Sequence, residues 1–402
     1  MTTARWLFAL QLVAMGAMEM SGPFWPLHLR RLGGLAPAGL AWASAAAYAG
    51  PLAMAMCTTP WWGRLGDRVG HKPMLLRALL ALAATQWWIA ATDSVAVILA
   101  VRLLQGALAG TIAAAQAYGA RLVTREARGA LMAQLQAATA IGAVAGPVLG
   151  GWLFDAWGFR TVNVWAGAAC LLCAAVAAAA LPPLPPTAPP PAAQPSAARP
   201  RPADLPDTMY GLLLGIVLVQ AGKMMPQTFF GLYASEVLHV SSRVTGLCYA
   251  GTALGLCVAA PFWARRFARM AHARVLAQVE WILWACVAIV AVQAAASDVG
   301  LFLLARVLWG ACLAALLPVF YGLLSRAAAD DEQGCVLGAG NGAAKAGALL
   351  GAGAGGLALA WVPLSAMFWT VALLYAGAAV GMRAIRIRSS HFQHLHTPTG
   401  IS

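Results

Sequence analysis

Five ionisable side chains interrupt stretches of sequence that are otherwise apolar. Glu19 stands in an otherwise uncharged run from Trp6 to Leu27, and Lys223 occupies a comparable position in the run 209–231. A carboxyl group shielded from water can bind and release a proton as its surroundings change, and a nearby cation alters its proton affinity. Glu19 is therefore a candidate for proton transfer, and Lys223 is a candidate for altering its proton affinity. The other three side chains are Arg102, Arg306 and Lys345.

The stretches that hold these residues must lie in a lipid bilayer. Of the 402 residues, 61% are hydrophobic and 10% are charged, and the mean hydropathy is +0.74. Soluble domains carry roughly 25% charged residues, and a chain of this size cannot hide so much apolar surface from water. No small-residue cleavage site follows Glu19, so we expect the first apolar run to be retained as a helix.

Twelve apolar segments are long enough to cross a bilayer as helices. With both termini cytoplasmic, eighteen of the 26 Lys and Arg residues fall on the inner side, four on the outer side and four within the segments. This asymmetry predicts a multi-pass protein of the cell (inner) membrane. The net charge of +13 is then a topology signal and does not indicate nucleic-acid binding. The segments are 5–27, 40–62, 74–92, 94–120, 131–153, 160–181, 209–231, 244–263, 275–296, 299–325, 335–361 and 364–382.

A proline-rich stretch divides the chain. Residues 182–206 contain eleven prolines and no aromatic residue, a composition that predicts an extended cytoplasmic linker. The expected fold class is an all-α membrane protein. Its expected domains are two six-helix bundles, 1–181 and 208–388, joined by a linker at 182–207 and followed by a cytoplasmic tail at 389–402.

The two predicted bundles repeat each other in sequence. Parallel repeats of this kind predict a transporter whose substrate site lies at the repeat interface, and three matches in the same order argue against chance similarity. YAG and PWWGR at 48–64 recur as YAG and PFWAR at 249–265, LAVRLLQGA at 99–107 recurs as LLARVLWGA at 303–311, and GAVAGPVLGG at 142–151 recurs as GALLGAGAGG at 347–356.

The turn between the second and third segments reads GRLGDRVGHKPML at 63–75. It resembles the loop signature G-x-L-x-D-R-x-G-R-K-x-x-L of the major facilitator superfamily, which implies twelve helices in two pseudo-symmetric bundles. In that family the loop latches the bundles together on the cytoplasmic side. We expect the first glycine to let the helix end approach its neighbour. His71 replaces the usual arginine, and Ala268 replaces the aspartate in the second-half copy, so a symmetric second latch is doubtful. The matching residues are Gly63, Leu65, Asp67, Arg68, Gly70, Lys72 and Leu75.

RLLQG at 102–106 resembles the R-x-x-Q-G pattern of the same superfamily. Arg102 lies about 12 Å below the outer end of its segment, where a cation needs a partner or a water-filled cavity. The resemblance implies that this arginine helps to move the coupling proton. The alternative is an arginine that snorkels to the interface. Arg306 is the equivalent residue of the second repeat, where Trp309 replaces Gln105. Its role is either in packing or in proton transfer.

GAVAGPVLGG resembles the g-x-x-x-G-P-x-x-G-G signature of antiporters in the superfamily, notably drug:proton exchangers. Its glycines permit close helix packing, so the two halves can close tightly against each other. Its proline bends the helix, which can then act as a hinge. The alternative is ordinary packing of small residues. The signature favours exchange over symport or uniport. The matching residues are Gly142, Gly146, Pro147, Gly150 and Gly151.

Glu19 is the predicted proton carrier. It lies about 21 Å along its helix, past the middle of a hydrocarbon core roughly 30 Å thick, where a charge costs about 2.5–3.5 kcal/mol. Lys223 stands at the matching depth of the seventh segment, and the first helix of each bundle lines the central cavity in the superfamily. Pro23, Pro26 and Pro226 are expected to loosen the backbone just beyond the two charges. A purely structural Glu19–Lys223 pair is the alternative.

The charges within the segments suggest the class of substrate. The segments contain four cations but one clear carboxylate, with Glu280 near an inner end as a second. This excess of positive charge favours an anionic, zwitterionic or metal-chelating substrate. The resemblance implies a proton-coupled exporter of a siderophore-like metabolite or drug that works by alternating access. An uptake symporter for a sugar or organic acid is the rival. The expected cavity residues are Lys223, Lys345, Arg306, Trp25, Tyr48, Phe229 and Tyr249.

Motifs for other chemistry are weak. GAGAGG at 351–356 matches a dinucleotide fingerprint, but no strand precedes it. Cys170 and Cys173 form a CxxC on a predicted span, where thiols act as small hydrophobes, and HFQHLH at 391–396 is interpreted as a solvated tail. We therefore expect no enzymatic activity, no cofactor and no metal site. The expected partners are the lipid bilayer, protons and a small-molecule substrate, and the protein is expected to be a monomer.

Overall fold

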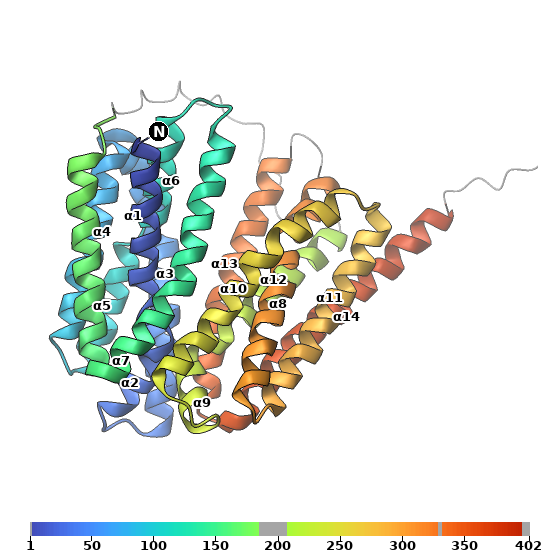
Figure 1. Cartoon of the computed structure of the whole chain (residues 1–402). Coiled ribbons are helices and arrows are strands. Elements are labelled where there is room, and N and C mark those ends of the chain that lie inside the picture. Colours follow the sequence, from blue (N-terminus) through green and yellow to red (C-terminus); the bar gives the residue numbers. More distant parts are fainter. Residues whose placement is uncertain (1, 185–206, 329–331, 396–402) are drawn as a thin grey trace, which may run out of the picture. The chain divides into compact units, whose positions relative to one another are not determined.

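The computed structural model describes residues 2–184, 207–328 and 332–395, and all regular elements in these ranges are helices. The predicted linker at 182–207 falls largely outside the described residues, and so do the side chains of the predicted tail at 389–402. The chain divides into two compact units (Figure 1). The first unit comprises Met1–Pro195, Gln227–Leu254 and Ala352–Ser365, and the second comprises Ser196–Pro226, Gly255–Gly351 and Ala366–Ser402.

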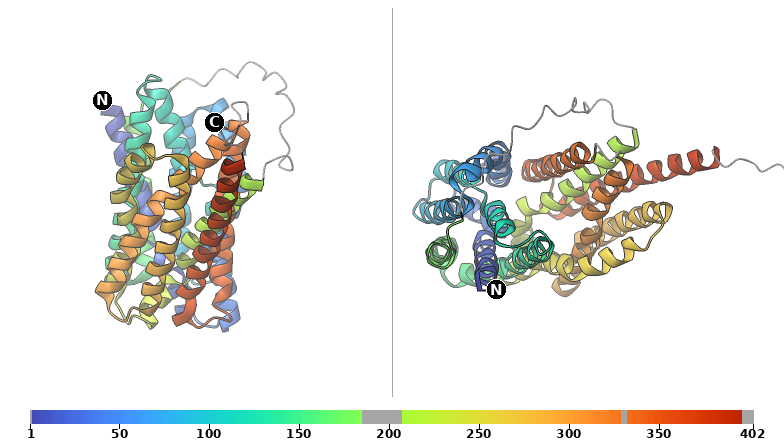
Figure 2. Two further views of the ribbon diagram at one scale, coloured as in Figure 1. Left: turned by 90° about the vertical axis from the view of Figure 1, so that its right-hand side faces the viewer. Right: turned by 90° about the horizontal axis from the view of Figure 1, so that it is seen from above.

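The first unit is built from helices that pack along their lengths. In the view from above, several of them are seen nearly end-on (Figure 2, right). Its elements are α1 (Thr2–Glu19), η1 (Gly22–Phe24), α2 (Trp25–Arg31), α3 (Pro37–Val69), α4 (His71–Ala90), α5 (Val95–Ala107), α6 (Thr111–Leu122), α7 (Arg128–Ala180) and α9 (Phe230–Glu236), together with the beginning of α10 (Ser242–Ala268) and the end of α13 (Gln333–Ala358).

The second unit has fewer helices than the first. Its elements are α8 (Asp207–Met224), the remainder of α10 and of α13, α11 (His272–Ala295), α12 (Val299–Ala327) and α14 (Met367–Leu395); the short helices η3 (Met225–Thr228) and η4 (Leu364–Ala366) lie where the chain passes from one unit to the other.

Twelve helical rods correspond to the twelve predicted segments, so the predicted fold class is confirmed. In this count α7 is two rods, because Gly158 in the middle of α7 has non-helical angles (φ 82°, ψ 177°). Three rods are interrupted and are each counted once: α1–η1–α2, α5–α6 and α8–η3–α9. Within the described residues, ten stretches are long and apolar enough to span a membrane. One of these stretches is the whole of α7, and α13, which is rich in glycine, is not among them.

Prolines interrupt the first helix of each predicted bundle, as expected. The chain passes from α1 into the 3-10 helix Gly22–Phe24 before α2 begins, and from α8 into the 3-10 helix Met225–Thr228 before α9 begins. The predicted segment 94–120 corresponds to the single candidate span Val95–Leu122, but the sequence did not predict an interruption inside it. The chain breaks between α5 and α6, where Gly110 adopts φ +126°, an angle that residues with a Cβ rarely adopt.

The interior of the first unit contains two clusters of buried apolar side chains. One surrounds Phe24, whose ring stacks on Phe154 with centroids 5.0 Å apart. The other surrounds Leu7 and Tyr118, which are both fully buried. Both clusters include residues of α1, so this helix is fixed along its whole length.

The internal repeat is visible in matching hydrogen bonds. In the first unit the indole nitrogen of Trp62 donates to the carbonyl of Ala107 at 2.7 Å. In the second unit the indole nitrogen of Trp263 donates to the carbonyl of Ala311 at 2.8 Å. These four residues occupy equivalent positions in the repeated motifs PWWGR/PFWAR and LAVRLLQGA/LLARVLWGA. The sequence repeat is therefore also a repeat of local structure.

Candidate functional site

The antiporter-type glycine motif of α7 packs against α1. A Cβ added to Gly142 would lie 2.6 Å from the carbonyl oxygen of Leu12, and one added to Gly146 would lie 2.4 Å from that of Gly16. A Cβ on Gly150 would lie only 1.9 Å from the carbonyl oxygen of Met20. Only glycine permits backbones to come this close. The motif therefore positions the turn of α1 that ends at Glu19.

The second unit repeats this packing with the same register. A Cβ added to Gly347 of α13 would lie 2.4 Å from the carbonyl oxygen of Val217 on α8, and one added to Gly351 would lie 2.3 Å from that of Ala221. Each of these four residues is 205 positions after its counterpart in the first unit.

This register corrects the expected equivalence of Glu19 and Lys223. Adding 205 positions to Glu19 leads to Met224, so Lys223 is the counterpart of Met18. One residue is a rotation of about 100° around a helix axis. The two charges therefore lie at nearly the same depth of equivalent helices, but on different faces.

Glu19 is half-buried and lies among polar groups of the first unit. Its Cβ is 3.0 Å from the position of a Cβ on Gly146. A Cβ on Gly22 would lie 3.2 Å from the carboxylate oxygen Oε2 of Glu19 and 3.7 Å from the hydroxyl of Tyr249. The hydroxyl of Tyr48 donates to the carbonyl of Gly22. The loosened backbone after α1 thus brings one carboxylate and two phenols to the same place.

Arg102 belongs to this group. Its Nε and Nη2 donate to the carbonyl of Ala47 at 2.9 and 2.8 Å, and its Nη1 donates to Oε1 of Gln105 at 2.5 Å. Its guanidinium carbon lies 4.8 Å from the centre of the Trp25 ring, and it is close enough to Glu19 to interact electrostatically. Ala47 is about 15 Å into α3, so these contacts hold the cation well away from the start of that helix.

The three other cations belong to the second unit. Arg306 is only 3% exposed and its guanidinium lies 5.0 Å from the centre of the Trp309 ring, one turn along the same helix. Lys223 is half-buried near the end of α8, and Lys345 is exposed on α13. The first unit thus brings Glu19 and Arg102 together, while Lys223, Lys345 and Arg306 are placed on separate helices of the second unit.

The aromatic residues predicted to line a cavity all lie in the first unit. Trp25 and Phe229 are 1% and 0% exposed, Tyr48 is 7% exposed, and Tyr249 is half-buried. Tyr48 and Tyr249 present their hydroxyls near Glu19, whereas Trp25 presents its ring face to Arg102. Their role as substrate contacts stays a prediction.

The basic turn between α3 and α4 is tightly built. Gly70 ends α3 with φ +103°, which favours glycine, and Asp67 lies 3.9 Å from His71. Lys72 donates to the carbonyl of Ala178 at 2.8 Å and to that of Leu181, so it caps the end of α7.

The expected close approach at Gly63 is not found in this turn. A Cβ there would meet nothing within 4 Å, whereas one at Gly66 would lie 3.2 Å from Met74. The latch role of Gly63, Asp67, Arg68, Gly70 and Lys72 stays a prediction.

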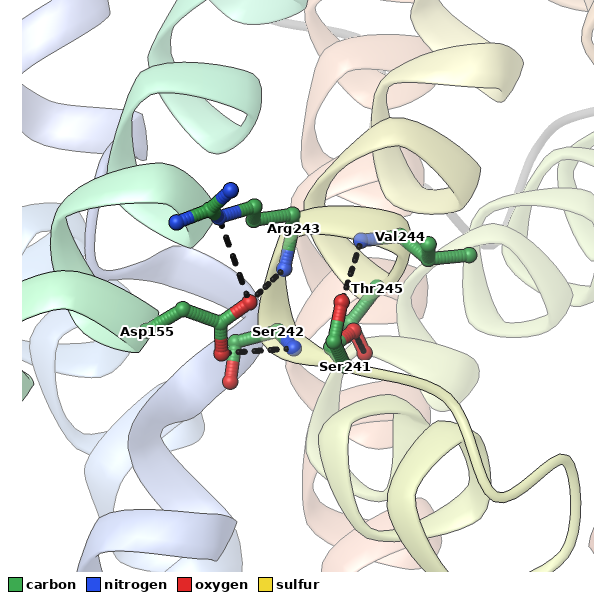
Figure 3. A network of polar contacts seen from close by, with 6 residues as sticks. All are labelled: Asp155, Ser241, Ser242, Arg243, Val244 and Thr245. Atoms are coloured by element: carbon green, nitrogen blue, oxygen red, sulfur yellow. Dashed lines mark hydrogen bonds and ion pairs between the residues drawn. The ribbon is translucent and has the colours of Figure 1, made fainter.

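A carboxylate that the sequence reasoning missed caps the first turn of α10 (Figure 3). Asp155 of α7 accepts hydrogen bonds from the backbone N–H groups of Ser242 and Arg243, both at 2.9 Å, and its Oδ2 lies 3.8 Å from Nε of Arg243. Ser241 accepts from the N–H of Val244 at 3.5 Å. Charge-assisted bonds to the free N–H groups of a helix start, together with the helix dipole, stabilise this contact.

The same contact uses the other side of the glycine motif. A Cβ added to Gly151 would lie 2.3 Å from the carbonyl oxygen of Ser242, and one added to Gly246 would lie 2.1 Å from that of Pro147. The motif on α7 is therefore packed against α1 on one side and against the start of α10 on the other.

We expect Asp155→Asn to weaken this cap. An amide offers one acceptor oxygen instead of two and carries no charge, so the variant should lose about 1–2 kcal/mol of local stability. Hydrogen exchange of the Ser242 and Arg243 amides should accelerate about tenfold. The matched control is Asp93→Asn, because Asp93 pairs with Arg160 at 3.6 Å while both are largely exposed, and such pairs contribute about 0–1 kcal/mol. Equal exchange rates in wild type and Asp155→Asn would contradict the capping role.

Two signals could have pointed to Asp155 earlier. It is an acidic residue four positions after the glycine pair that ends the motif, and the segment Ser241–Ser242 offers a helix start far away in sequence. Neither segment by itself indicates that Asp155 and the helix start at Ser241–Ser242 are in contact. Gln105 and Gly22 are assigned to the site only by their contacts in the structure. Gln105 accepts a hydrogen bond from Arg102, and Gly22 lies next to Tyr48 and Glu19.

A comparison with known families decides what kind of protein this is. The sequence profile described as "Major Facilitator Superfamily" matches residues 7–207 and 212–399. The chain belongs to the Major Facilitator Superfamily. It is therefore a multi-pass membrane transporter, and the resemblance inferred from its motifs is confirmed.

Relatives of this facilitator include a multidrug resistance protein and a staphyloferrin B transporter. It is 28% identical over 157 residues to the multidrug resistance protein MdtG of Klebsiella pneumoniae, and 27% identical over 158 residues to the staphyloferrin B transporter of Staphylococcus aureus. Each match covers 39% of this chain and 38% of the relative, so the chain matches these relatives over about two fifths of their length. The fold resembles that of the human organic anion transporter MFSD10, with a TM-score of 0.60, 19% identity and coverage of 95% and 99% of the two chains.

Proposed function

We propose that this facilitator exports a small organic molecule in exchange for protons, by alternating access. The observation that supports this most directly is the position of Glu19. The antiporter-type glycine motif packs against the turn of α1 that carries it, and Tyr48, Tyr249 and Arg102 lie around it. An acid at the centre of a tightly packed helix pair can respond to small changes in that packing.

Glu19 acts as the proton carrier in this proposal. Contact with water favours its ionised form, and burial favours its protonated form. A change in the hydration of this side chain during the transport cycle therefore changes its proton affinity. Arg102, held on the Ala47 carbonyl and on Gln105, favours the ionised carboxylate in the state in which both are close. Proton and substrate then compete for the same region, which is the requirement for exchange.

The proposed substrate is anionic, zwitterionic or metal-chelating, such as a siderophore-like metabolite. The support is the balance of charges within the spans, where Arg102, Arg306, Lys223 and Lys345 outnumber the carboxylates. Similarity to a staphyloferrin B transporter supports a siderophore-like molecule, and similarity to MdtG supports a drug. Uptake of a sugar or organic acid by symport is the second candidate, which the antiporter-type motif at 142–151 disfavours.

The same proposal includes the membrane topology. Both termini are cytoplasmic, because this places eighteen Lys and Arg residues on the inner side and four on the outer side. The turn 63–75 then lies on the inner side, where the corresponding loop of the family latches the two bundles. We also propose that the protein works as a monomer.

Proteoliposomes with an imposed pH gradient test the proposed function. The purified protein should move a labelled siderophore-like chelator against its gradient when protons flow the opposite way, and the substrate should in turn dissipate the pH gradient. In cells, metabolite profiling of the medium in iron-poor and iron-rich growth should reveal a compound that is outside only when the protein is present. Accumulation of the compound inside the cells would instead establish uptake, and transport unaffected by the pH gradient would exclude proton coupling.

A further inference from the structure

The end of α10 that leads to α11 carries a cluster of arginines with no acidic residue in the neighbouring sequence. Arg265 and Arg266 are exposed on the last turn of the helix, Arg269 is exposed directly after it, and no Asp or Glu occurs between residues 255 and 279. The equivalent turn of the first repeat contains Asp67, and the second repeat has Ala268 at that position. The proposed latch does not use this cluster.

A cavity of about 610 Å³ lies at this cluster. Val258, Pro261, Phe262 and Met270 provide its apolar lining. Arg265, Arg266 and Arg269 line the same cavity. A single hollow therefore offers an apolar surface and several guanidinium groups.

The two kinds of lining follow one another along the helix. Val258 and Phe262 come first and are 72% and 57% exposed, and the arginines follow at the helix end. From Val258 to Arg269 the helix axis extends about 16 Å. Exposed apolar residues suit the depth of acyl chains, and arginines at a helix end suit the depth of phosphate groups.

In the first repeat, the charged side chains of the equivalent turn have partners within the protein. There Asp67 lies 3.9 Å from His71, and Lys72 donates to the carbonyls of Ala178 and Leu181. In the second repeat, Arg266 donates to the side-chain oxygen of Gln278 at 3.3 Å, which is a neutral acceptor. Among the residues that the structure describes, Arg265, Arg266 and Arg269 form no ion pair with an acid, so an anion from outside the chain can bind there.

We propose that this cavity binds an anionic phospholipid of the inner leaflet. Its phosphate lies among Arg265, Arg266 and Arg269, and an acyl chain lies along Phe262 and Val258. Guanidinium groups form paired hydrogen bonds with phosphate oxygens. A free phosphate ion would use only the arginines, whereas a phospholipid uses both parts of the cavity. This inference rests on the proposed topology, which places this turn on the inner side, but not on the direction of transport or on its substrate.

Native mass spectrometry of the purified protein, titrated with phosphatidylglycerol or phosphatidylcholine, tests the proposal. The wild type should bind one phosphatidylglycerol clearly more tightly than phosphatidylcholine. Replacing both Arg265 and Arg269 with glutamine should weaken this binding about tenfold or more. Ala268→Asp, which restores the acid of the first repeat and keeps every arginine, should weaken it in the same direction. Size-exclusion profiles and melting curves verify that the variants are folded.

Two controls separate the site from general charge attraction and from phosphate binding. The double variant Arg383→Gln/Arg388→Gln removes two exposed charges from α14 in the same unit and should change the affinity less than twofold. Phe262→Ser should weaken phosphatidylglycerol binding although it removes no charge. An equal loss in both double variants, no loss in any variant, or displacement of the lipid by millimolar inorganic phosphate would each overturn the proposal.

Discussion

Replacing Glu19 with glutamine will abolish proton-driven transport while leaving the protein folded in the membrane. Glutamine keeps the size and shape of the side chain beside Gly146 and Gly22, so the packing of α1 on α7 is retained. It cannot take up or release a proton in the physiological range, and the loss of a positioned proton-transfer group reduces rates by about 100-fold or more. Proton release from membrane vesicles on addition of substrate measures the effect.

Glu280 provides the matched control for this prediction. It is a second carboxylate within the predicted spans, near an inner end, 8% exposed and paired with Arg386 of α14 at 2.9 Å. Glu280→Gln should lower the melting temperature, because it leaves a cation without its charged partner, but it should retain proton-coupled transport. Full transport by Glu19→Gln, or an equal loss of coupling in Glu280→Gln, would refute the assignment of Glu19.

Gly146→Ala will damage both stability and transport. The added Cβ would lie 2.4 Å from the carbonyl oxygen of Gly16 and 3.0 Å from the Cβ of Glu19. Neither backbone can yield without moving its helix, so we expect a loss of about 1–3 kcal/mol from overpacking together with displacement of the carboxylate. Thermal unfolding in detergent and transport in proteoliposomes measure the two effects.

The repeat offers controls that separate the two effects. Gly351→Ala creates the same clash with Ala221 in the second unit. There the residue that corresponds to Glu19 is Met224, which has no ionisable group. Gly351→Ala should reduce stability by a similar amount and leave proton uptake intact in the protein that remains folded. Gly353→Ala, where a Cβ meets nothing within 4 Å, should be close to neutral. If Gly146→Ala were neutral as well, the close packing of α1 on α7 would be refuted.

The fold could be predicted because its signals are local or repeated. Runs of apolar residues located twelve segments that correspond to the twelve rods, although α13, which is rich in glycine, is not among the ten stretches that length and hydropathy mark as spans. The repeat of YAG, PWWGR and GAVAGPVLGG located equivalent helices, and the hydrogen bonds of Trp62 and Trp263 show the equivalence in atomic terms. The break between α5 and α6 was missed, because Gly110 lies in an apolar stretch whose hydropathy does not change there.

The candidate site could be predicted only in part, since its geometry depends on contacts between distant segments. Glu19 and Arg102 stood out as charges in apolar sequence. That Arg102 is held by Ala47 and Gln105 follows from the packing of α5 on α3, which no single segment encodes. The face of α8 that carries Lys223 was similarly undetermined until the glycine contacts fixed its register. Asp155 was invisible for the same reason, because its partners lie 87 and 88 residues away.

The interruption between α5 and α6 makes the two repeats mechanically unequal. Its ends are fastened from the side by Trp62, which bonds to Ala107, and by Arg77, which bonds to Ala109 at 3.1 Å. The counterpart α12 runs as one rod from Val299 to Ala327. An unbroken rod transmits a push from end to end, whereas a jointed one absorbs part of it as local rotation. The fourth rod of the N-terminal repeat is therefore expected to rotate at this joint more readily than α12 does at the equivalent place.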